Sequence, residues 1–336
     1  MKLALNHIAF EITSNCNLNC QYCYNIWKMP DSKLTHYNSY KQSLKTLKKL
    51  FKIADIKNIA FTGGEPLMAE RFLEIVLYCR MQGKSITIIS NGTYGKLEDY
   101  QHLINMGVGL FEIPIHSPTE RIHDEMTQLS GSWKKSQETI KYIVENGGYV
   151  VPVIVLTKFN ASVLGETLSF IASLGLNRIM LNRYNIGGYG LTNPMNISLS
   201  QNELKSAFDV ANVMSSKHNL VISSNVCTPR CVLNPADYPA IAFGNCSTNV
   251  LNRPLTLDIE GNIRLCNHSP IVAGNIYKQN LNEILFSEYT DKWETDIPEY
   301  CSKCDLWNLC LGGCRAASEQ MGNTLLKEDP VISLYS

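Results

Sequence analysis

The sequence has no excess of charge of either sign. Its 30 lysine and arginine residues are matched by 30 aspartate and glutamate residues. It therefore lacks the basic field that attracts nucleic acid or an anionic membrane, and we expect neither partner. It also lacks the roughly 18 consecutive apolar residues of a membrane span, and its start, MKLALNHIAFEI, contains no signal-peptide stretch. These absences predict a cytoplasmic protein without a membrane anchor.

Internal repeats, low-complexity tracts and flexible linkers are also absent. Up to about residue 184, short β-branched runs alternate with amphipathic helical stretches, which is typical of βα units around a parallel sheet. We predict six strands, which cover residues 3–12, 58–62, 85–90, 109–115, 149–156 and 178–184. Six such units make a partial TIM-like (β/α)6 barrel, in which ligands bind at the C-terminal ends of the strands.

The pattern changes after a helix that we predict over residues 201–217. The chain then becomes irregular and rich in cysteine, with one hairpin predicted where LTLDI and NIRLC flank Glu260 and Gly261. We therefore predict an α/β partial barrel over residues 1–218 and a second, cysteine-rich domain over residues 219–336. In a reducing compartment, such clustered cysteines are more often metal ligands or catalytic thiols than disulfides.

Three cysteines follow the first predicted strand directly: Cys16, Cys20 and Cys23, in the segment CNLNCQYC. Ordinary electron-transfer clusters are closed by four cysteines, whereas three leave one iron of a four-iron cluster open to a substrate or cofactor. A structural zinc site is the alternative, but zinc generally needs four ligands, and no fourth cysteine or histidine lies near in the sequence.

This segment resembles the radical S-adenosylmethionine superfamily, whose motif is CxxxCxxC with an aromatic residue, here Tyr22, before the last cysteine. The resemblance implies that a [4Fe-4S] cluster on these three cysteines is the catalytic centre. Its open iron would bind the amine and carboxylate of S-adenosylmethionine, and one-electron reduction would release a 5′-deoxyadenosyl radical. Tyr22 would lie near the adenine.

Two further loops resemble cofactor-binding segments of the same superfamily. Gly63-Gly64-Glu65-Pro66 matches its GGEP segment, in which glycines permit close backbone approach and Glu65 can accept hydrogen bonds from the methionyl ammonium. In isolation this segment would be an ordinary strand-to-helix turn. Ser90 and Asn91 resemble a segment near the ribose and methionine, although a Ser-Asn-Gly run is also a common turn.

The fourth and sixth predicted strands end in residues with weaker signals. Strand alternation directs His116 into the site, whereas we expect His123 and Asp124 to cap or brace the following loop. Arg183 stands beside a glycine-rich loop, and we expect it to bind a carboxylate of the cofactor or the substrate. A surface salt bridge is the alternative for Arg183.

Eight cysteines in the C-terminal part suffice for two four-cysteine clusters: Cys227, Cys231, Cys246, Cys266, Cys301, Cys304, Cys310 and Cys314. The run CSKCDLWNLCLGGC, with Gly261 shortly before the hairpin cysteine, resembles the SPASM domain of peptide- and protein-modifying enzymes. The resemblance implies one or two auxiliary iron-sulfur clusters. One would take Cys246, Cys266 and Cys314, with Cys231 or Cys227 as the fourth ligand. The other would take Cys301, Cys304 and Cys310.

The cysteine that closes the second cluster in many SPASM proteins is missing, because no cysteine follows Cys314. The open alternatives are closure by Cys227, by a carboxylate such as Asp305 or Asp329, or by substrate. A pair of zinc knuckles is the competing interpretation of the whole run. Cys79, on a helix of apolar periodicity, is expected to be a buried core thiol.

The resemblance implies a function in maturing a ribosomally made peptide, through hydrogen abstraction from a peptide or protein side chain. A crosslink, an epimerised residue or an oxidised residue would result. The implied partners are the peptide, a separate peptide-recognition protein, and an electron donor such as ferredoxin or flavodoxin. Sulfatase maturation and haem-pathway chemistry are alternative reactions, suggested by the CNLxCxYC segment and by the GGCR and EDP segments. A non-catalytic iron-sulfur carrier or scaffold is the alternative from another class.

Overall fold

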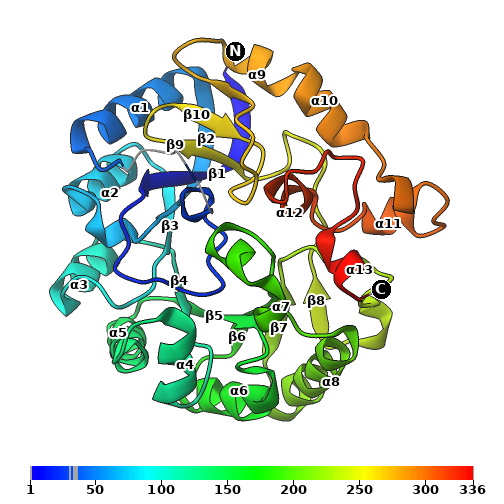
Figure 1. Ribbon diagram of the computed structural model, residues 1–336. Coiled ribbons are helices and arrows are strands. Elements are labelled where there is room, and N and C mark those ends of the chain that lie inside the picture. Colours follow the sequence, from blue (N-terminus) through cyan, green and yellow to red (C-terminus); the bar gives the residue numbers. More distant parts are fainter. Residues whose placement is uncertain (1, 30–31, 33–36, 336) are drawn as a thin grey trace.

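The computed structural model describes residues 2–29, 32 and 37–335, which form one large sheet with helices around it (Figure 1). All six predicted strands are present and pair in parallel in chain order. They are β1 (Leu3–Thr13), β2 (Ala54–Gly63), β3 (Ser85–Ile89), β4 (Leu110–Pro114), β5 (Val150–Leu156) and β6 (Arg178–Arg183). The α/β fold with a parallel sheet is thereby confirmed.

Helices cover the outer face of this sheet, as the blue to green part of Figure 1 shows. They are α1 (Tyr40–Ile53), α2 (Phe72–Met81), α3 (Leu97–Asn105), α4 (Glu120–Thr127), α5 (Ser132–Glu145), α6 (Leu164–Ser173) and α8 (Gln201–His218). The short helix α7 (Pro194–Ile197) lies inside the ring (Figure 1). Local signals set their starts. The Ser39 side chain accepts a hydrogen bond at the first turn of α1, and Ser200 forms a capping box with Glu203 at the start of α8.

The sheet extends beyond the six predicted strands on both sides. The two parallel strands β7 (Val221–Ser224) and β8 (Ile241–Phe243) follow β6, and β9 (Leu255–Asp258) pairs in parallel with β1. The predicted hairpin is formed by β9 and the antiparallel β10 (Asn262–Arg264), with β11 (Gly274–Asn275) at the edge. The six predicted strands and the hairpin are thus present, whereas β7, β8 and β11 were not predicted, because strands of two to four residues are too short to show a periodicity. The sheet also continues past the predicted boundary at residue 218.

The strands separate a packed outer core from a less crowded interior. In β5, fully buried residues such as Ile154 and Leu156 alternate with half-buried ones such as Val153 and Val155. The buried row belongs to the main core with residues of α6, whereas Val155 packs near Tyr22 in a second cluster. The half-buried row therefore lines the interior of the barrel, where the site is expected.

The C-terminal segments occupy the side of the ring between β8 and β10, where the sheet does not close (Figure 1). They contain α9 (Leu281–Leu285), α10 (Glu288–Thr295), α11 (Trp307–Cys310), α12 (Arg315–Gln320) and α13 (Pro330–Tyr335). Trp293 of α10 is completely buried, and the Arg253 guanidinium lies 4.6 Å from the centre of its ring. Within the described ranges, no helix is long and apolar enough to cross a membrane.

A buried ion pair joins the first strand to the C-terminal hairpin. Arg264 of β10 pairs with Glu11 of β1, and both side chains are almost fully buried. Arg264 also donates through Nη1 to the carbonyl oxygens of Asn267 (3.1 Å) and Ser269 (2.7 Å). The pair therefore fixes the loop that follows Cys266 against the barrel.

We predict that Glu11→Ala lowers the free energy of unfolding by about 3–5 kcal/mol, because it leaves the Arg264 charge buried without a partner. The double variant Glu11→Leu with Arg264→Met should lose much less, since it removes both charges. Urea unfolding of samples with equal iron content measures both values. Equal losses for the single and the double variant would show that the pair is not energetically coupled.

Candidate cofactor and metal sites

Cys16, Cys20 and Cys23 lie half-buried in the loop that follows β1, at the carboxyl end of the barrel. Backbone hydrogen bonds tie this loop to the end of α4, with the Gln21 amide 3.0 Å from the Met126 carbonyl oxygen. The three thiols lie close enough for their charges to interact. Burial, together with the neighbouring Cys23, raises the pKa of Cys20 to about 12. Such gathered thiols repel one another once ionised unless a cation binds, so they fit an iron-sulfur cluster.

Gly63 and Gly64 bring the turn after β2 directly against the chain that enters the cysteine loop. A Cβ atom on Gly63 would stand 2.2 Å from the Thr13 carbonyl oxygen, and one on Gly64 would stand 2.0 Å from that of Asn15. The Gly64 amide donates to the Thr13 oxygen and the Glu65 amide donates to the Asn15 oxygen, each at a distance of 2.7 Å. The glycines thus permit the close backbone approach that the sequence indicated, and the approach is to the protein chain itself. Pro66 begins a short helical turn, as in an ordinary strand-to-helix connection.

The Glu65 carboxylate joins the second and third loops of the site. It is completely buried, and it accepts hydrogen bonds from Ser90 Oγ (2.8 Å), the Asn91 amide (2.8 Å) and the Leu67 amide (3.2 Å). The Asn91 side-chain nitrogen donates to Asn17 (2.9 Å) in the cysteine loop and lies 3.9 Å from the Cys16 sulfur. Burial raises the pKa of Glu65 to about 7. A carboxylate has about four lone-pair positions, so one remains for a further donor such as an ammonium group.

Tyr22 is held by His116 from the end of β4. The Tyr22 hydroxyl lies 2.6 Å from His116 Nε2, and the two rings meet edge to face. The Val155 amide donates to His116 Nδ1 over 3.3 Å, so Nε2 carries the proton and donates to the tyrosine. His116 is buried and contacts Tyr22, so it positions that residue. Asp124 caps the start of α5, as expected.

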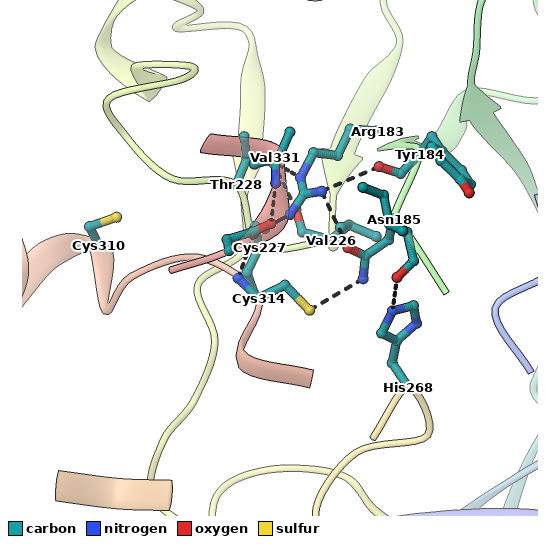
Figure 2. A network of polar contacts seen from close by, with 12 residues as sticks. Arg183, Tyr184, Asn185, Val226, Cys227, Thr228, His268, Cys310, Cys314 and Val331 are labelled. Atoms are coloured by element: carbon teal, nitrogen blue, oxygen red, sulfur yellow. Dashed lines mark hydrogen bonds and ion pairs between the residues drawn. The ribbon is translucent and has the colours of Figure 1, made fainter. Parts of the chain in front are cut away.

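Arg183 requires a correction. It is 2% exposed and forms a buried ion pair with Asp329. Figure 2 shows Arg183 among Thr228, Cys227 and Tyr184. Its remaining N–H groups donate to Thr228 Oγ1 and to the Cys227, Tyr184 and Asn185 oxygens. All five donors therefore have acceptors, and none is left for a carboxylate of cofactor or substrate. The predicted alternative of a surface pair is also wrong, because the pair is buried.

The eight C-terminal thiols lie in two groups of four. The neighbouring Cys246, burial and the nearby Cys314 and Cys266 raise the pKa of Cys227. Burial raises the pKa of Cys231, and the charges of Cys310 and Cys304 raise it further. Burial also raises the pKa of Cys301, and the charges of Cys310, Cys231 and Cys304 raise it further. Groups of four thiols fit closed iron-sulfur clusters. Across the described residues, no three histidine, cysteine or acidic side chains are gathered as the ligands of a single metal ion.

Contacts that the sequence did not indicate join the cysteine loop to the C-terminal domain. Gln320 of α12 donates to the Tyr24 carbonyl oxygen (2.8 Å) and the His268 carbonyl oxygen (2.6 Å), and it accepts from the Gly188 amide (2.7 Å). The Tyr24 hydroxyl accepts from Asn267, the residue after Cys266, over 2.7 Å. No periodicity or motif marks these residues, because each acts through a partner far away in sequence.

Glu112 of β4 was also missed. It stands half-buried between the buried Phe111 and Ile113, so it belongs to the row that lines the barrel interior. Burial raises its pKa to about 7. An acidic residue in the middle of an apolar strand, FEIPI, was the available signal.

The protein families and relatives that this sequence matches agree with this geometry. Residues 10–171 match the family model of the radical SAM superfamily, and residues 246–305 match the SPASM model, an iron-sulfur cluster-binding domain. Two curated relatives cover nearly the whole chain. The chain is 20% identical to PqqA peptide cyclase of Methylocella silvestris, over 96% of this chain and 86% of the relative. It is 24% identical to AdoMet-dependent heme synthase of Oleidesulfovibrio alaskensis, over 97% and 86%.

The fold is also similar to solved structures. Streptococcus suis SuiB bound to precursor peptide SuiA aligns with a TM-score of 0.75 and 15% identity, over 98% of this chain and 76% of SuiB. The radical SAM domain implies S-adenosylmethionine and a [4Fe-4S] cluster, and the SPASM domain implies auxiliary iron-sulfur clusters. The chain is therefore an enzyme of the radical SAM superfamily with a C-terminal SPASM domain.

Proposed function

We propose that the enzyme abstracts a hydrogen atom from a peptide or protein side chain, in the maturation of a ribosomally made peptide. The observation that carries the proposal is the direct contact between a three-thiol site at the barrel mouth and a domain with eight further thiols. Two similar proteins support the proposal. One relative is a PqqA peptide cyclase, and SuiB, which has a similar fold, was solved with its precursor peptide bound.

In this proposal the residues at the barrel mouth have separate roles. Cys16, Cys20 and Cys23 would hold the cluster, and S-adenosylmethionine bound there supplies a 5′-deoxyadenosyl radical after one-electron reduction. Glu65 accepts a hydrogen bond from the methionyl ammonium with its remaining lone pair. Tyr22, fixed by His116, would lie beside the adenine, and Ser90 with Asn91 would complete the pocket.

The interior of the barrel is suited to a reactive carbon radical. The half-buried row of β5 consists of Val151, Val153 and Val155, which offer only carbon side chains to the interior. Bound substrate closes this space against water, and side reactions are thereby reduced. A ferredoxin or flavodoxin supplies the electrons, a separate protein presents the peptide, and the reaction takes place in the cytoplasm.

A haem-pathway reaction is the second candidate, and the AdoMet-dependent heme synthase relative favours it. One experiment separates the two. Anaerobically reconstituted enzyme is incubated with S-adenosylmethionine and dithionite, in one sample with short peptides encoded beside its gene and in another with a porphyrin precursor. The products are analysed by mass spectrometry in H₂O and D₂O. Loss of hydrogens, or deuterium uptake without mass loss, supports peptide modification. Unchanged peptides, with turnover of a porphyrin precursor instead, would contradict it.

Replacement of Cys16, Cys20 and Cys23 together by alanine should remove about four irons per chain and abolish 5′-deoxyadenosine formation, because thiolates are the ligands of the cluster iron. The auxiliary clusters should remain. Iron analysis and chromatography measure the two effects. Cofactor cleavage by the triple variant would show that the radical site lies elsewhere.

Glu65→Gln should weaken binding of S-adenosylmethionine roughly ten- to a hundredfold, since a hydrogen bond to a charged group contributes about 1.5–3 kcal/mol. Isothermal titration of the reconstituted variant measures the affinity. Glu74→Gln, the same change on the exposed face of α2, is the matched control and should bind as wild type does. Equal affinity for Glu65→Gln at unchanged iron content would remove Glu65 from the cofactor site.

A further inference from the structure

The loop after β7 carries two cysteines, Cys227 and Cys231, that lie in different surroundings. Cys227 is half-buried, and the thiols that lie near enough to act on it are Cys246, Cys314 and Cys266. Cys231 is exposed, and the charges that act on its thiol come from Cys310 and Cys304. Residues only four apart in the sequence therefore belong to different groups of thiols.

A direct contact supports this division. The amide of Arg230, the residue before Cys231, donates to the Cys310 sulfur over 3.3 Å. The turn around Cys301 and Cys304 lies on the same side, because the charges of Cys310, Cys231 and Cys304 all act on Cys301. The segment that carries Cys231 is thus in contact with the run CSKC…C.

The other closing groups considered from the sequence have other partners or make no hydrogen bond to these thiols among the described residues. Asp329 is buried, and its carboxylate accepts from Arg183, from the Cys314 amide (2.7 Å) and from the Val331 amide (3.0 Å). Asp305 is exposed and has no hydrogen bond to these thiols among the described residues. Cys227 lies beside Cys246, in the other group of thiols. Cys231 is the thiol that remains.

The network around Arg183 holds the two cysteines apart. Arg183 donates to the Cys227 carbonyl oxygen (2.8 Å) and to Thr228 (Figure 2). Its partner Asp329 accepts from the Cys314 amide. Gly313 permits this packing, because a Cβ there would stand 2.6 Å from Pro229. The Pro229 carbonyl then accepts from the Val232 and Leu233 amides, and the loop turns outward at Cys231. Cys227 consequently faces Cys314, and Cys231 faces outward to Cys310.

We propose that Cys231 is the fourth ligand of the second auxiliary cluster, with Cys301, Cys304 and Cys310, and that Cys227 completes the first, with Cys246, Cys266 and Cys314. The inference rests on the iron-sulfur part of the proposed function and is independent of the substrate. Each thiol loses its proton and binds iron as a thiolate. Four thiolates leave no open iron in the second cluster, so it transfers electrons and does not bind substrate. Its exposed ligands Cys231 and Cys304 place it at the surface, within reach of an electron donor.

The test uses the full chain with Cys16, Cys20 and Cys23 replaced by alanine, so that only auxiliary clusters contribute to the spectra. Cys231→Ser is compared with Cys301→Ser and with Cys246→Ser, by iron analysis and by EPR and Mössbauer spectroscopy. We expect Cys231→Ser to lose about four irons and the same spectral component as Cys301→Ser. Cys227→Ser should match Cys246→Ser. Cys79→Ser, in the buried face of α2, is the control and should change neither reading.

Two results would overturn the proposal: a Cys231→Ser spectrum that matches Cys246→Ser, or one that keeps both clusters unchanged. If the serine variant does not fold, Cys231→Asp takes its place, because a carboxylate can also bind iron. The aspartate variant should keep its iron and should alter only the spectral component that Cys301→Ser removes. An unaltered spectrum of the aspartate variant contradicts the assignment. Because no reading depends on peptide chemistry, a negative peptide assay would refute the proposed reaction and leave this ligand assignment standing.

Discussion

Buried thiolates repel one another, and this repulsion is the constraint around which the molecule is arranged. Eleven of the 12 cysteines lie in three groups, and burial raises the pKa of most of them. Such groups are stable in the ionised form only when iron compensates the charge. The backbone around each group must therefore be fixed by interactions that do not depend on the thiols.

Those interactions connect segments that are distant in sequence. Glu65 holds the loops after β2 and β3 together, and Asn91 joins them to the cysteine loop. Glu11 with Arg264 anchors the hairpin that carries Cys266, and Arg183 with Asp329 anchors the ends of two other cysteine segments. Glu65 and the two ion pairs are buried charged groups with partners from distant segments, which makes their positions specific.

The radical site and the SPASM domain are consequently one structural unit. Gln320 and Tyr24 connect the cysteine loop with the loop after Cys266, and β9 lies in the same sheet as β1. The cysteine loop of the barrel and the loop after Cys266 are therefore joined by direct contacts within packed protein.

The sequence by itself determined the parallel α/β barrel, the three-cysteine loop and the polar segments at the strand ends, because periodicity and short motifs are local properties. It also indicated that eight thiols form a second cysteine-rich region. Only the tertiary structure decided the strands β7 and β8, the role of Arg183 and the separation of Cys227 from Cys231. These depend on long-range contacts, such as those of Asp329 with Arg183 and Cys314. Spacing along the chain cannot reveal them, because two cysteines four residues apart can face opposite sides of one loop.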